Sequence, residues 1–460
     1  MKELTLGTLA RWCGGTLTRE TDSAVIVRGM RHDSRQVSPG DLFVALVGER
    51  ADGHDFVNAA AKAGACAVMV EHPVETELPQ LIVPNALKAY GAIAAAYRLE
   101  TDVKVVAITG SVGKTTTKEM ISCVLEEDFR VAKTQGNHNN DLGLPITVMD
   151  MAADTQLAVL ELGMNHFGEM SYLTSIARPD VVVITNIGTM HIEHLGTREG
   201  ILKAKLEIMQ GIRDDGVAVF NGDEPLLWNL REGQHKRLYF GIENDCCDVI
   251  ASDIENRDGG VGFTAKGLGH ELKVFVPQEG RHTVYNALAA ITVGLLCKVS
   301  GETLCRRLEE FANTGMRQHV FTEKGFTIIE DCYNAGPESM EAALTVLHER
   351  KTEGRRIAVL GDMLELGTRS MAEHYRVGRM VAEKAELLFS YGEISDRYVI
   401  GAVTGGMKEK KALHFATREE LAKALAAAAK PGDVLLFKGS RGMKMEQVLK
   451  LFLEEVSSRA

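Results

Sequence analysis

The 460-residue chain has a formal net charge of −11, with 45% hydrophobic and 25% charged residues. This composition is ordinary for folded globular domains, and the length predicts about three of them. The acidic charge argues against a nucleic-acid-binding protein, which presents a basic face. No stretch approaches the roughly 18 apolar residues of a membrane span, and the first residues lack the apolar centre of a signal peptide, so we expect a cytoplasmic protein. The eight cysteines are scattered without a C-x-x-C pair, which is typical of reduced thiols.

The first hundred residues mix short strands with alanine-rich helices. We expect strands over residues 41–46, 68–70 and 81–83, and helices over residues 57–63 and 86–99. A polar joint at residues 100–102 separates this region from the next. We therefore predict a small α/β domain over residues 1–100.

The central third alternates apolar strands with helical patterns, which is typical of βαβ units and a parallel sheet. Strands are expected over residues 103–108, 157–160, 181–185 and 217–220. Short, glycine-broken strands between residues 249 and 276 indicate an antiparallel addition at the sheet edge, and helical patterns return at 284–297 and 302–311. We predict a parallel-sheet domain over residues 101–313.

The last third repeats this rhythm. Strands are expected over residues 327–330, 356–360, 387–389 and 434–437. Three of them end in polar loops, and ligands of open α/β sheets bind beyond the carboxyl ends of the strands. We therefore predict a second α/β domain over residues 314–460, with a polar rim of its own.

A candidate phosphate-binding loop, residues 110–116, follows the first strand of the central domain. Its glycines let backbone N–H groups approach phosphate oxygens, Lys114 reaches the phosphates, and the Thr115 hydroxyl can hold Mg²⁺. We expect the next helix to begin near residues 118–119. A full Walker A motif has another glycine where Ile108 stands, so an ordinary glycine-rich turn is the alternative. The pattern predicts a loop that binds a nucleoside triphosphate.

Two polar residues follow neighbouring strands of the predicted sheet. Glu161 ends one strand, where a carboxylate can hold Mg²⁺ beside phosphates, but it could equally be a capping or solvated glutamate. His191 follows another strand and could be a metal ligand, or an ordinary loop or core histidine. Taken one at a time, these residues leave both alternatives open.

Two further clusters are ambiguous on their own. Asn137, Asn139 and Asn140 offer donors and acceptors for sugar hydroxyls or phosphates, or serve as turn residues that tolerate left-handed backbone. Lys203 and Lys205 lie in a helical stretch and, without other information, predict a solvated face.

Taken together and in this order, these stretches resemble the ATP-dependent Mur ligases of peptidoglycan synthesis. The matching segments are residues 109–115, 136–140, 161–163, 186–191, 204–205, 280–282, 286–290, 316–317, 331–334 and 438–441. They extend over nearly the whole chain. The resemblance also explains Ile108, because this family has the shorter G-x-x-G-K-[ST] loop.

The resemblance implies three α/β domains: a small N-terminal uridine-nucleotide domain, a central P-loop ATPase domain with a parallel sheet, and a C-terminal Rossmann-like domain. The first of these is matched by Asp33, Ser34 and Arg35, which are the expected contacts to the uridine nucleotide. Two family members share that domain. One adds the third residue of the peptide, and the other adds D-alanyl-D-alanine (D-Ala-D-Ala).

The C-terminal domain distinguishes the two members. The Asp-Asn-Pro-Arg stretch of the third-residue ligase is missing here, whereas residues 331–337 and 361–367 resemble the D-Ala-D-Ala-adding member, with Gly336 in place of its usual asparagine. We therefore expect ligation of D-Ala-D-Ala to UDP-N-acetylmuramoyl-tripeptide (UDP-MurNAc-tripeptide) by a monomeric, cytoplasmic enzyme. The third-residue ligase is the alternative.

The family reaction uses ATP to turn a carboxylate into an acyl phosphate, which a free amine attacks. The resemblance assigns the nucleotide to Gly110, Ser111, Val112, Gly113, Lys114, Thr115, Thr116, Asn286, Arg317 and Asp331. It assigns one Mg²⁺ to Thr115 and Glu161 and a second to His191 and a carbamylated Lys205, with Lys203 as the substitute. Lys114, His191 and Lys205 are the expected catalytic residues. The remaining expected substrate contacts are Asn137, Asn139, Asn140, Asn334, Lys438, Ser440 and Arg441.

A P-loop switch protein is an alternative from another functional class. It would bind nucleotide without turnover that depends on an amino acid. The sequence has no Asn-Lys-x-Asp stretch of the kind that specifies guanine, which argues against this alternative.

Overall fold

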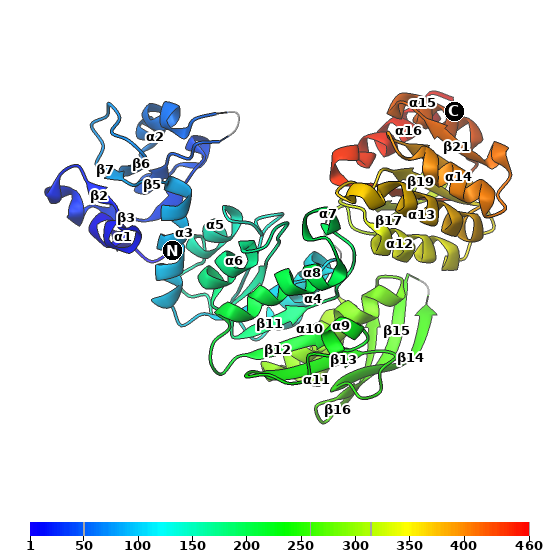
Figure 1. The fold of residues 1–460 in the computed structure, drawn as a ribbon, viewed down its shortest axis with the longest axis horizontal. Helices are drawn as coiled ribbons and strands as arrows, with labels where there is room; N and C mark the ends of the chain where they lie inside the picture. Colours follow the sequence, from blue (N-terminus) through cyan, green and yellow to red (C-terminus); the bar gives the residue numbers. More distant parts are fainter. Residues whose placement is uncertain (49–50, 258, 313–314, 460) are drawn as a thin grey trace.

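The computed structural model of the chain describes residues 1–48, 51–257, 259–312 and 315–459. They form three α/β units in chain order, each built on a sheet of its own. Figure 1 shows the N-terminal unit (blue) and the C-terminal unit (yellow to red) on either side of the central unit (cyan to green). The predicted three-domain α/β fold is confirmed, and the predicted boundary between residues 313 and 314 lies outside the described residues.

The N-terminal unit has a five-stranded sheet and three helices. The sheet order is β2 (Thr16–Leu17), β7 (Gln80–Ile82), β6 (Ala67–Val70), β5 (Asp41–Val44) and β4 (Gly29–Arg31), and only β2 is antiparallel to its neighbour. A separate ribbon pairs β1 (Leu4–Thr5) with β3 (Ile26–Val27). The helices are α1 (Leu6–Cys13), α2 (Val57–Ala63) and α3 (Ala86–Leu99), of which the last two match the predicted ranges.

The central unit is a nine-stranded mixed sheet. Its parallel strands, in spatial order, are β9 (Val131–Lys133), β10 (Leu157–Glu161), β8 (Lys104–Thr109), β11 (Val181–Ile184), β12 (Val217–Asn221), β13 (Lys236–Gly241) and β14 (Val249–Arg257). The antiparallel addition predicted over residues 249–276 begins one strand later than expected, because β14 pairs parallel with β13. It consists of β15 (Gly260–Gly267) and β16 (His270–Val276), which extend the sheet beyond β14. The helices are α4 (Lys114–Leu125), α5 (Gly143–Met149), α6 (Glu169–Ala177), α7 (Ile192–Leu195), α8 (Arg198–Leu206), α9 (Pro225–Trp228), α10 (Arg281–Leu296) and α11 (Gly301–Glu309).

Strand β8 is apolar along its length because both of its faces are buried. Val105 and Ala107 belong to the core beneath α5, α6 and α8, whereas Val106 and Ile108 belong to the core beneath α4, α10 and α11. Successive side chains of a strand point to opposite faces, so both sets must be apolar. Helix α3 packs on α5 and α6, and the first of these cores continues into the N-terminal unit.

Helix α4 begins at Lys114, not near residue 118 as predicted from the sequence. The threonines at positions 115–117 have low helix propensity, which makes the first turn look like loop in the sequence. Gly113, in the left-handed conformation with φ 85°, immediately precedes the helix. The correction places Lys114, Thr115 and Thr116 in the first helical turn, where backbone N–H groups have no helical carbonyl to bind.

The C-terminal unit is a six-stranded sheet covered on both faces. Its order is β17 (His319–Glu323), β18 (Phe326–Asp331), β22 (Val434–Lys438), β19 (Arg356–Gly361), β20 (Leu387–Tyr391) and β21 (Ala412–Phe415), and only β17 is antiparallel to its neighbour. One core lies beneath α12 (Pro337–Glu349), α13 (Ser370–Lys384) and α14 (Asp396–Thr404), and the other beneath α15 (Arg418–Ala428) and α16 (Met445–Arg459). All four predicted strands of this region are present.

Short 3₁₀ segments complete the described chain. They are η1 (Glu20–Ala24), η2 (Ser34–Gln36), η3 (Gly53–Phe56), η4 (Glu207–Gly211), η5 (Gly367–Arg369), η6 (Glu409–Lys411) and η7 (Arg441–Met443). Within the described ranges, the structure contains no helix with the length and apolar character needed to span a bilayer.

Candidate active site

The phosphate loop leaves β8 between the carboxyl ends of its neighbours β10 and β11. A side chain at Gly110, where φ is 152°, would collide with Thr185 Oγ1, and one at Gly113 would press on Asn286 Oδ1. Both positions therefore require glycine. The first-turn N–H groups of α4 point out of the helix beyond Gly113, and such a terminus binds anions.

Thr115 and Glu161 lie side by side at this edge of the sheet. Thr115 Oγ1 donates to Glu161 Oε2 at 2.8 Å, and Asn139 Nδ2 donates to Oε1 at 2.9 Å. Glu161 is only 3% exposed, so it is a buried hydrogen-bond acceptor and not a solvated surface residue. Hydroxyl and carboxylate oxygens are ligands that Mg²⁺ takes together with phosphates and water. Among the described residues, no group of three or more His, Cys, Asp or Glu side chains could hold a metal ion.

Lys114 bends back over its own loop. Its Nζ donates to the carbonyl oxygen of Gly110 at 2.8 Å and to that of Ser111 at 3.4 Å. Burial lowers the pKa of the Lys114 ammonium group, while Glu161 raises it in part and Arg317 lowers it further. The ammonium group thus lies directly above the loop, where a phosphate would meet it.

Asn186, just after the carboxyl end of β11, holds the loop in place, a role that was not predicted from the sequence. Its Oδ1 accepts from the N–H groups of Ser111 at 3.1 Å and Val112 at 2.9 Å, and its Nδ2 donates to Val112 O at 3.2 Å. The N–H groups of Ser111 and Val112, predicted to meet phosphate, therefore face Asn186. Gly188 N–H also donates to Ser111 Oγ at 2.9 Å. The available signal was the position of Asn186 after a strand that neighbours β8.

The structure separates the two candidate lysines. Lys205 is 2% exposed, and its pKa is well below the ordinary value because of burial and, to a lesser extent, because of nearby Lys114. Lys203 is exposed, and its Nζ lies 5.7 Å from the centre of the Phe167 ring. His191, partly buried, has its Nδ1 2.9 Å from Oε2 of Glu365 in the C-terminal unit. Burial lowers the pKa of His191 and Glu365 partly restores it.

The three predicted nucleotide contacts outside the loop converge from three parts of the chain. Asn286 on α10, Arg317 after the central unit and Asp331 at the end of β18 line one cavity with the phosphate loop. The Arg317 guanidinium lies 3.9 Å from the centre of the Tyr333 ring. Asp331 accepts from Lys438 Nζ at 2.6 Å. The cavity, of about 390 Å³, lies between the central and C-terminal units.

The four C-terminal residues predicted to contact substrate have different surroundings. Lys438 is 2% exposed. Its Nζ donates to Asp331 Oδ2 at 2.6 Å and to the carbonyl oxygen of Asn334 at 3.0 Å. Ser440 is buried, and its Oγ accepts from Leu364 N–H at 2.9 Å. Arg441 is half-exposed and paired with Glu446 at 3.1 Å. Asn334, Ser440 and Arg441 line a smaller adjoining cavity of about 120 Å³.

The asparagine cluster divides between the two roles weighed from the sequence. Asn139 binds Glu161, as described above. Asn140 Oδ1 accepts from Gly143 N–H at 2.9 Å, which makes it a turn residue at the start of α5. Asn137 is exposed. All three line the cavity of the phosphate loop.

The predicted uridine-nucleotide residues belong to the N-terminal unit and do not line the cavity of the phosphate loop. Asp33, the N-cap residue of η2, forms an ion pair with Arg35 in that segment, with Arg35 Nη2 2.7 Å from Asp33 Oδ2. The hydrogen bonds from Arg35 lower the pKa of Asp33 to about 2. Ser34 lies between them. A ligand that reached both this group and the loop would extend across the N-terminal and central units.

Gln318, just before β17 of the C-terminal unit, contacts the central unit. This role was also not predicted from the sequence. Its Oε1 lies 2.7 Å from His282 Nε2, and its Nε2 donates to Glu279 O at 2.7 Å. A second contact between units is Glu338 on α12, which accepts from Thr189 N–H at 2.8 Å and from Thr189 Oγ1 at 3.2 Å. These polar contacts hold the C-terminal unit over the loop that carries His191.

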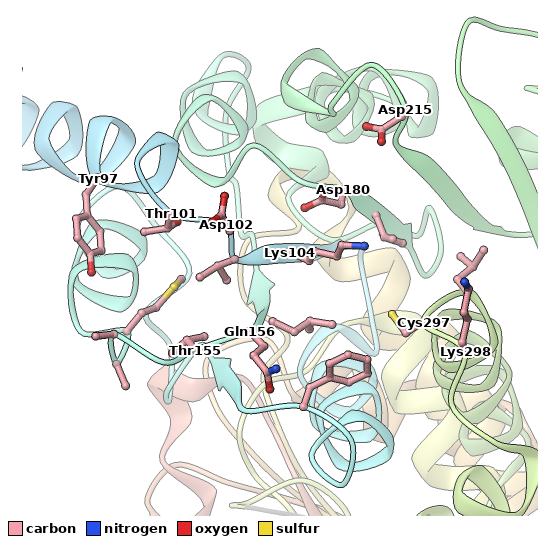
Figure 2. Close-up of a pocket in the computed structure, with 18 of the residues that line it drawn as sticks. Tyr97, Thr101, Asp102, Lys104, Thr155, Gln156, Asp180, Asp215, Cys297 and Lys298 are labelled. Atoms are coloured by element: carbon pink, nitrogen blue, oxygen red, sulfur yellow. The ribbon is translucent and has the colours of Figure 1, made fainter. Parts of the chain in front are cut away.

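A larger cavity of about 640 Å³ lies at the opposite edge of the central sheet, near the amino ends of the strands. Figure 2 shows Lys104, Asp180 and Asp215 around it, together with Lys298 from the loop after α10. It contains none of the predicted site residues and no glycine loop. The cavity of about 390 Å³ that contains the phosphate loop, at the carboxyl ends of the strands, is therefore the candidate active site.

Comparison with known proteins agrees with this geometry. The chain matches the family descriptions "Mur ligase family, catalytic domain" over residues 26–113, "Mur ligase middle domain" over residues 108–294 and "Mur ligase, glutamate ligase domain" over residues 316–441. It is 40% identical over 460 residues to the UDP-N-acetylmuramoyl-tripeptide–D-alanyl-D-alanine ligase of Bacillus subtilis (strain 168). This match covers 99% of both chains.

Two crystal structures have the same fold. One, of MurF from Acinetobacter baumannii, has a TM-score of 0.90 and 33% identity and covers 99% of both chains. Another, of MurF ligase from Thermotoga maritima in complex with ADP, has a TM-score of 0.84 and 30% identity, covering 94% of this chain and 99% of that one. This chain therefore belongs to the Mur ligase family.

Proposed function

We propose that this chain uses ATP to ligate D-Ala-D-Ala to UDP-MurNAc-tripeptide, releasing ADP and phosphate. The observation that carries the proposal is the 40% identity, over 99% of both chains, to a ligase named for this reaction. The cavity between the central and C-terminal units supports it, because it brings a phosphate loop next to polar residues of a second domain.

The chemistry requires activation of a carboxylate, which is a poor electrophile. Transfer of the γ-phosphoryl group of ATP to the peptide carboxylate gives an acyl phosphate. The amine of D-Ala-D-Ala then attacks the carbonyl carbon, phosphate leaves, and the amine loses its proton. Lys114 and the first-turn N–H groups of α4 would stabilise the charge on the phosphate oxygens. Contact between the units would exclude water from the acyl phosphate.

Thr115 and Glu161 would hold Mg²⁺, and their hard oxygen atoms fit that ion. The cation would neutralise charge on the phosphate oxygens. His191 and Lys205 would hold a second ion. A buried lysine with a lowered pKa is available as the neutral amine, the form that adds CO₂ to give a carbamate. The carbamate would supply an anionic oxygen ligand where an ammonium group would repel the metal.

The other assignments follow the resemblance. Asn286 would contact the adenine, Asp331 the ribose hydroxyls, and Arg317 the nucleotide beside them. The uridine nucleotide would bind at Asp33, Ser34 and Arg35. The peptide substrates would be contacted by Asn137, Asn139, Asn140, Asn334, Lys438, Ser440 and Arg441. We also propose that the enzyme is a cytoplasmic monomer, which sedimentation of the purified chain and cell fractionation test.

Phosphate release with a panel of UDP-muramyl peptides tests the function. We expect release with ATP, UDP-MurNAc-tripeptide and D-Ala-D-Ala together, and background release when any one is omitted. Release only with the dipeptide precursor and a diamino acid would show the third-residue ligase instead. Nucleotide binding without turnover on any peptide would favour a regulatory P-loop protein.

A further inference from the structure

Glu365 and His191 face each other across the boundary between the C-terminal and central units, and both have left-handed backbone. Their φ values are 62° and 64°, and His191 Nδ1 lies 2.9 Å from Glu365 Oε2. Residues other than glycine rarely adopt this conformation, and it persists only where the surrounding structure imposes it. Such strain at two facing residues points to a geometry that serves a function.

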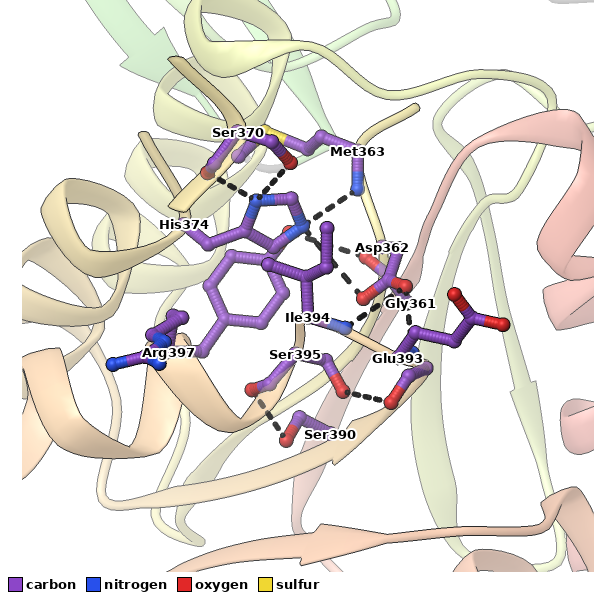
Figure 3. A network of polar contacts seen from close by, with 12 residues as sticks. Gly361, Asp362, Met363, Ser370, His374, Ser390, Glu393, Ile394, Ser395 and Arg397 are labelled. Carbon is purple, nitrogen blue, oxygen red and sulfur yellow. Dashed lines mark hydrogen bonds and ion pairs between the residues drawn. The ribbon is translucent and has the colours of Figure 1, made fainter. Parts of the chain in front are cut away.

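The loop that carries Glu365 follows β19, and its first residues, Asp362 and Met363, belong to a buried polar network (Figure 3). His374, fully buried, donates from Nδ1 to the carbonyl of Ser370 at 2.7 Å, so its Nε2 is the acceptor for Met363 N–H at 3.0 Å. Asp362 Oδ2 accepts from the N–H groups of Glu393 at 2.8 Å and Ile394 at 3.3 Å. The start of the loop is thus fixed to α13 and to the segment after β20.

The same loop is also tied to the end of β22. Ser440 N–H donates to Asp362 O at 3.0 Å, and Leu364 N–H donates to Ser440 Oγ at 2.9 Å. Each residue from 362 to 364 therefore has a hydrogen bond to another segment. Glu365 follows directly, with its carboxylate 53% exposed. The supports hold the backbone, and the carboxylate, paired through Oε2 with His191, remains half-exposed at the cavity wall.

The carboxylate borders the cavity of about 120 Å³ that adjoins the cavity of the phosphate loop. The two cavities share Met190, His191, Asn334 and Ala335. The smaller one is well below the roughly 300–1,000 Å³ of sites for drug-sized ligands, so it suits a ligand of two short residues. Arg441 lines it as well, so its wall carries one group for a cation and one for an anion.

We propose that Glu365 binds the ammonium group of the incoming D-Ala-D-Ala and that Asp362 and His374 are positioning residues for it. The inference rests on the proposed function, because it assigns a contact to the amine substrate of that reaction. Binding there would direct the amine toward His191 and the adjoining phosphate cavity, where the acyl phosphate would form. The small methyl side chains would then lie against Leu364 and Met190, which line the same cavity.

The first test is Glu365→Gln, which keeps the shape of the side chain and removes its charge. We expect the KM for D-Ala-D-Ala to rise by about tenfold or more, because a hydrogen bond to a charged group is lost, with less than about twofold change in the KM for ATP and for UDP-MurNAc-tripeptide. Glu365→Asp should recover part of the loss. Glu393→Gln is the matched control, because Glu393 is exposed and joins the network only through its backbone.

A ligand without the amine separates recognition from a structural effect. D-lactoyl-D-alanine, in which a hydroxyl replaces the amine, should inhibit the wild type more weakly than the dipeptide binds. In Glu365→Gln that preference for the amine should disappear. Equal weakening of both ligands, or an unchanged KM for the dipeptide, would overturn the inference. Failure of the wild type to use D-Ala-D-Ala would overturn the proposed function instead.

The positioning residues are tested by a double-mutant cycle. His374→Gln alone should raise the KM for D-Ala-D-Ala without raising that for ATP. Combined with Glu365→Gln it should add little further, because coupled residues are not additive. Full additivity would assign His374 to general stability and reject its positioning role. If His374→Gln does not fold, the Glu365 variants still decide the principal contact.

Discussion

Thr115 Oγ1 donates a 2.8 Å hydrogen bond to Glu161 Oε2, joining the first turn of α4 to the carboxyl end of β10. The two residues are far apart in sequence and meet because β8 and β10 are neighbours in the sheet. Asn139 holds the other carboxylate oxygen. Hydrogen bonds to both of its oxygens thus orient the Glu161 carboxylate.

Removing the charge of Glu161 should reduce turnover more than nucleotide affinity. Glu161→Gln keeps an acceptor for Thr115 but loses the negative charge that would hold Mg²⁺. We expect kcat to fall by about 100-fold or more, the scale of losing one electrostatic group in an active site, and the Mg²⁺ concentration for half-maximal activity to rise. Phosphate release across a Mg²⁺ titration measures both. Thr115→Ser retains the hydroxyl and should stay within a few-fold of wild type, and an unchanged Mg²⁺ dependence in Glu161→Gln would contradict the assignment.

Asn186 should control the shape of the phosphate loop. Asn186→Ala leaves the N–H group of Val112 without its acceptor, whereas the N–H group of Ser111 keeps only the backbone carbonyl of residue 186, at 3.2 Å. An unsatisfied buried donor costs about 1–3 kcal/mol, so ADP should bind roughly 5- to 150-fold more weakly. Calorimetric titration with ADP measures this change. Asn140→Ala, which affects a turn outside the loop, should leave ADP affinity within about threefold, and equal effects of the two variants would contradict a specific role for Asn186.

The two lysines of α8 should differ sharply. Lys205→Ala should lose activity by about 100-fold or more, because it removes a buried group that interacts electrostatically with Lys114, whereas Lys203→Ala should stay within about threefold. If Lys205 acts as a carbamate, short carboxylic acids added to Lys205→Ala should restore part of the phosphate release. Absence of rescue would argue against the carbamate. Loss of activity in Lys203→Ala, with Lys205→Ala still active, would show that Lys203 has this role instead of Lys205.

The pH dependence of stability should carry a contribution from His282. Burial lowers the pKa of His282 below its ordinary value of 6.5, and the hydrogen bond to Gln318 offsets part of the effect. The unfolded state therefore binds a proton more readily, so the stability from this residue is full above about pH 6.5 and falls as the pH decreases toward the folded pKa. His282→Gln should flatten the dependence of the unfolding free energy between about pH 7 and 5. Urea unfolding measures it, with His319→Gln on the surface as control; identical slopes for His282→Gln and wild type would contradict the prediction.

Most of the secondary structure could be predicted because strong local patterns specify it. The Val/Ile runs of β8 and β11 and the alanine-rich α3 appear at or within a residue or two of the expected positions. The predicted start of α4 was wrong because the threonines of its first turn have low helix propensity. The turn at Gly113 and packing on α10 stabilise this first turn in the folded chain. Local preference underestimates a helix whose first turn is built into a binding site.

The sequence by itself determined the order of the elements, the glycine loop and the residue types available at the ends of the strands. These depend on side-chain periodicity and backbone preference, which act over a few residues. Only the tertiary structure decided that Asn186 holds the loop, that Lys205 is buried while Lys203 is exposed, and that Glu365 meets His191. Strand order and the docking of one domain on another bring these groups together, and neither is encoded in the spacing of residues along the chain.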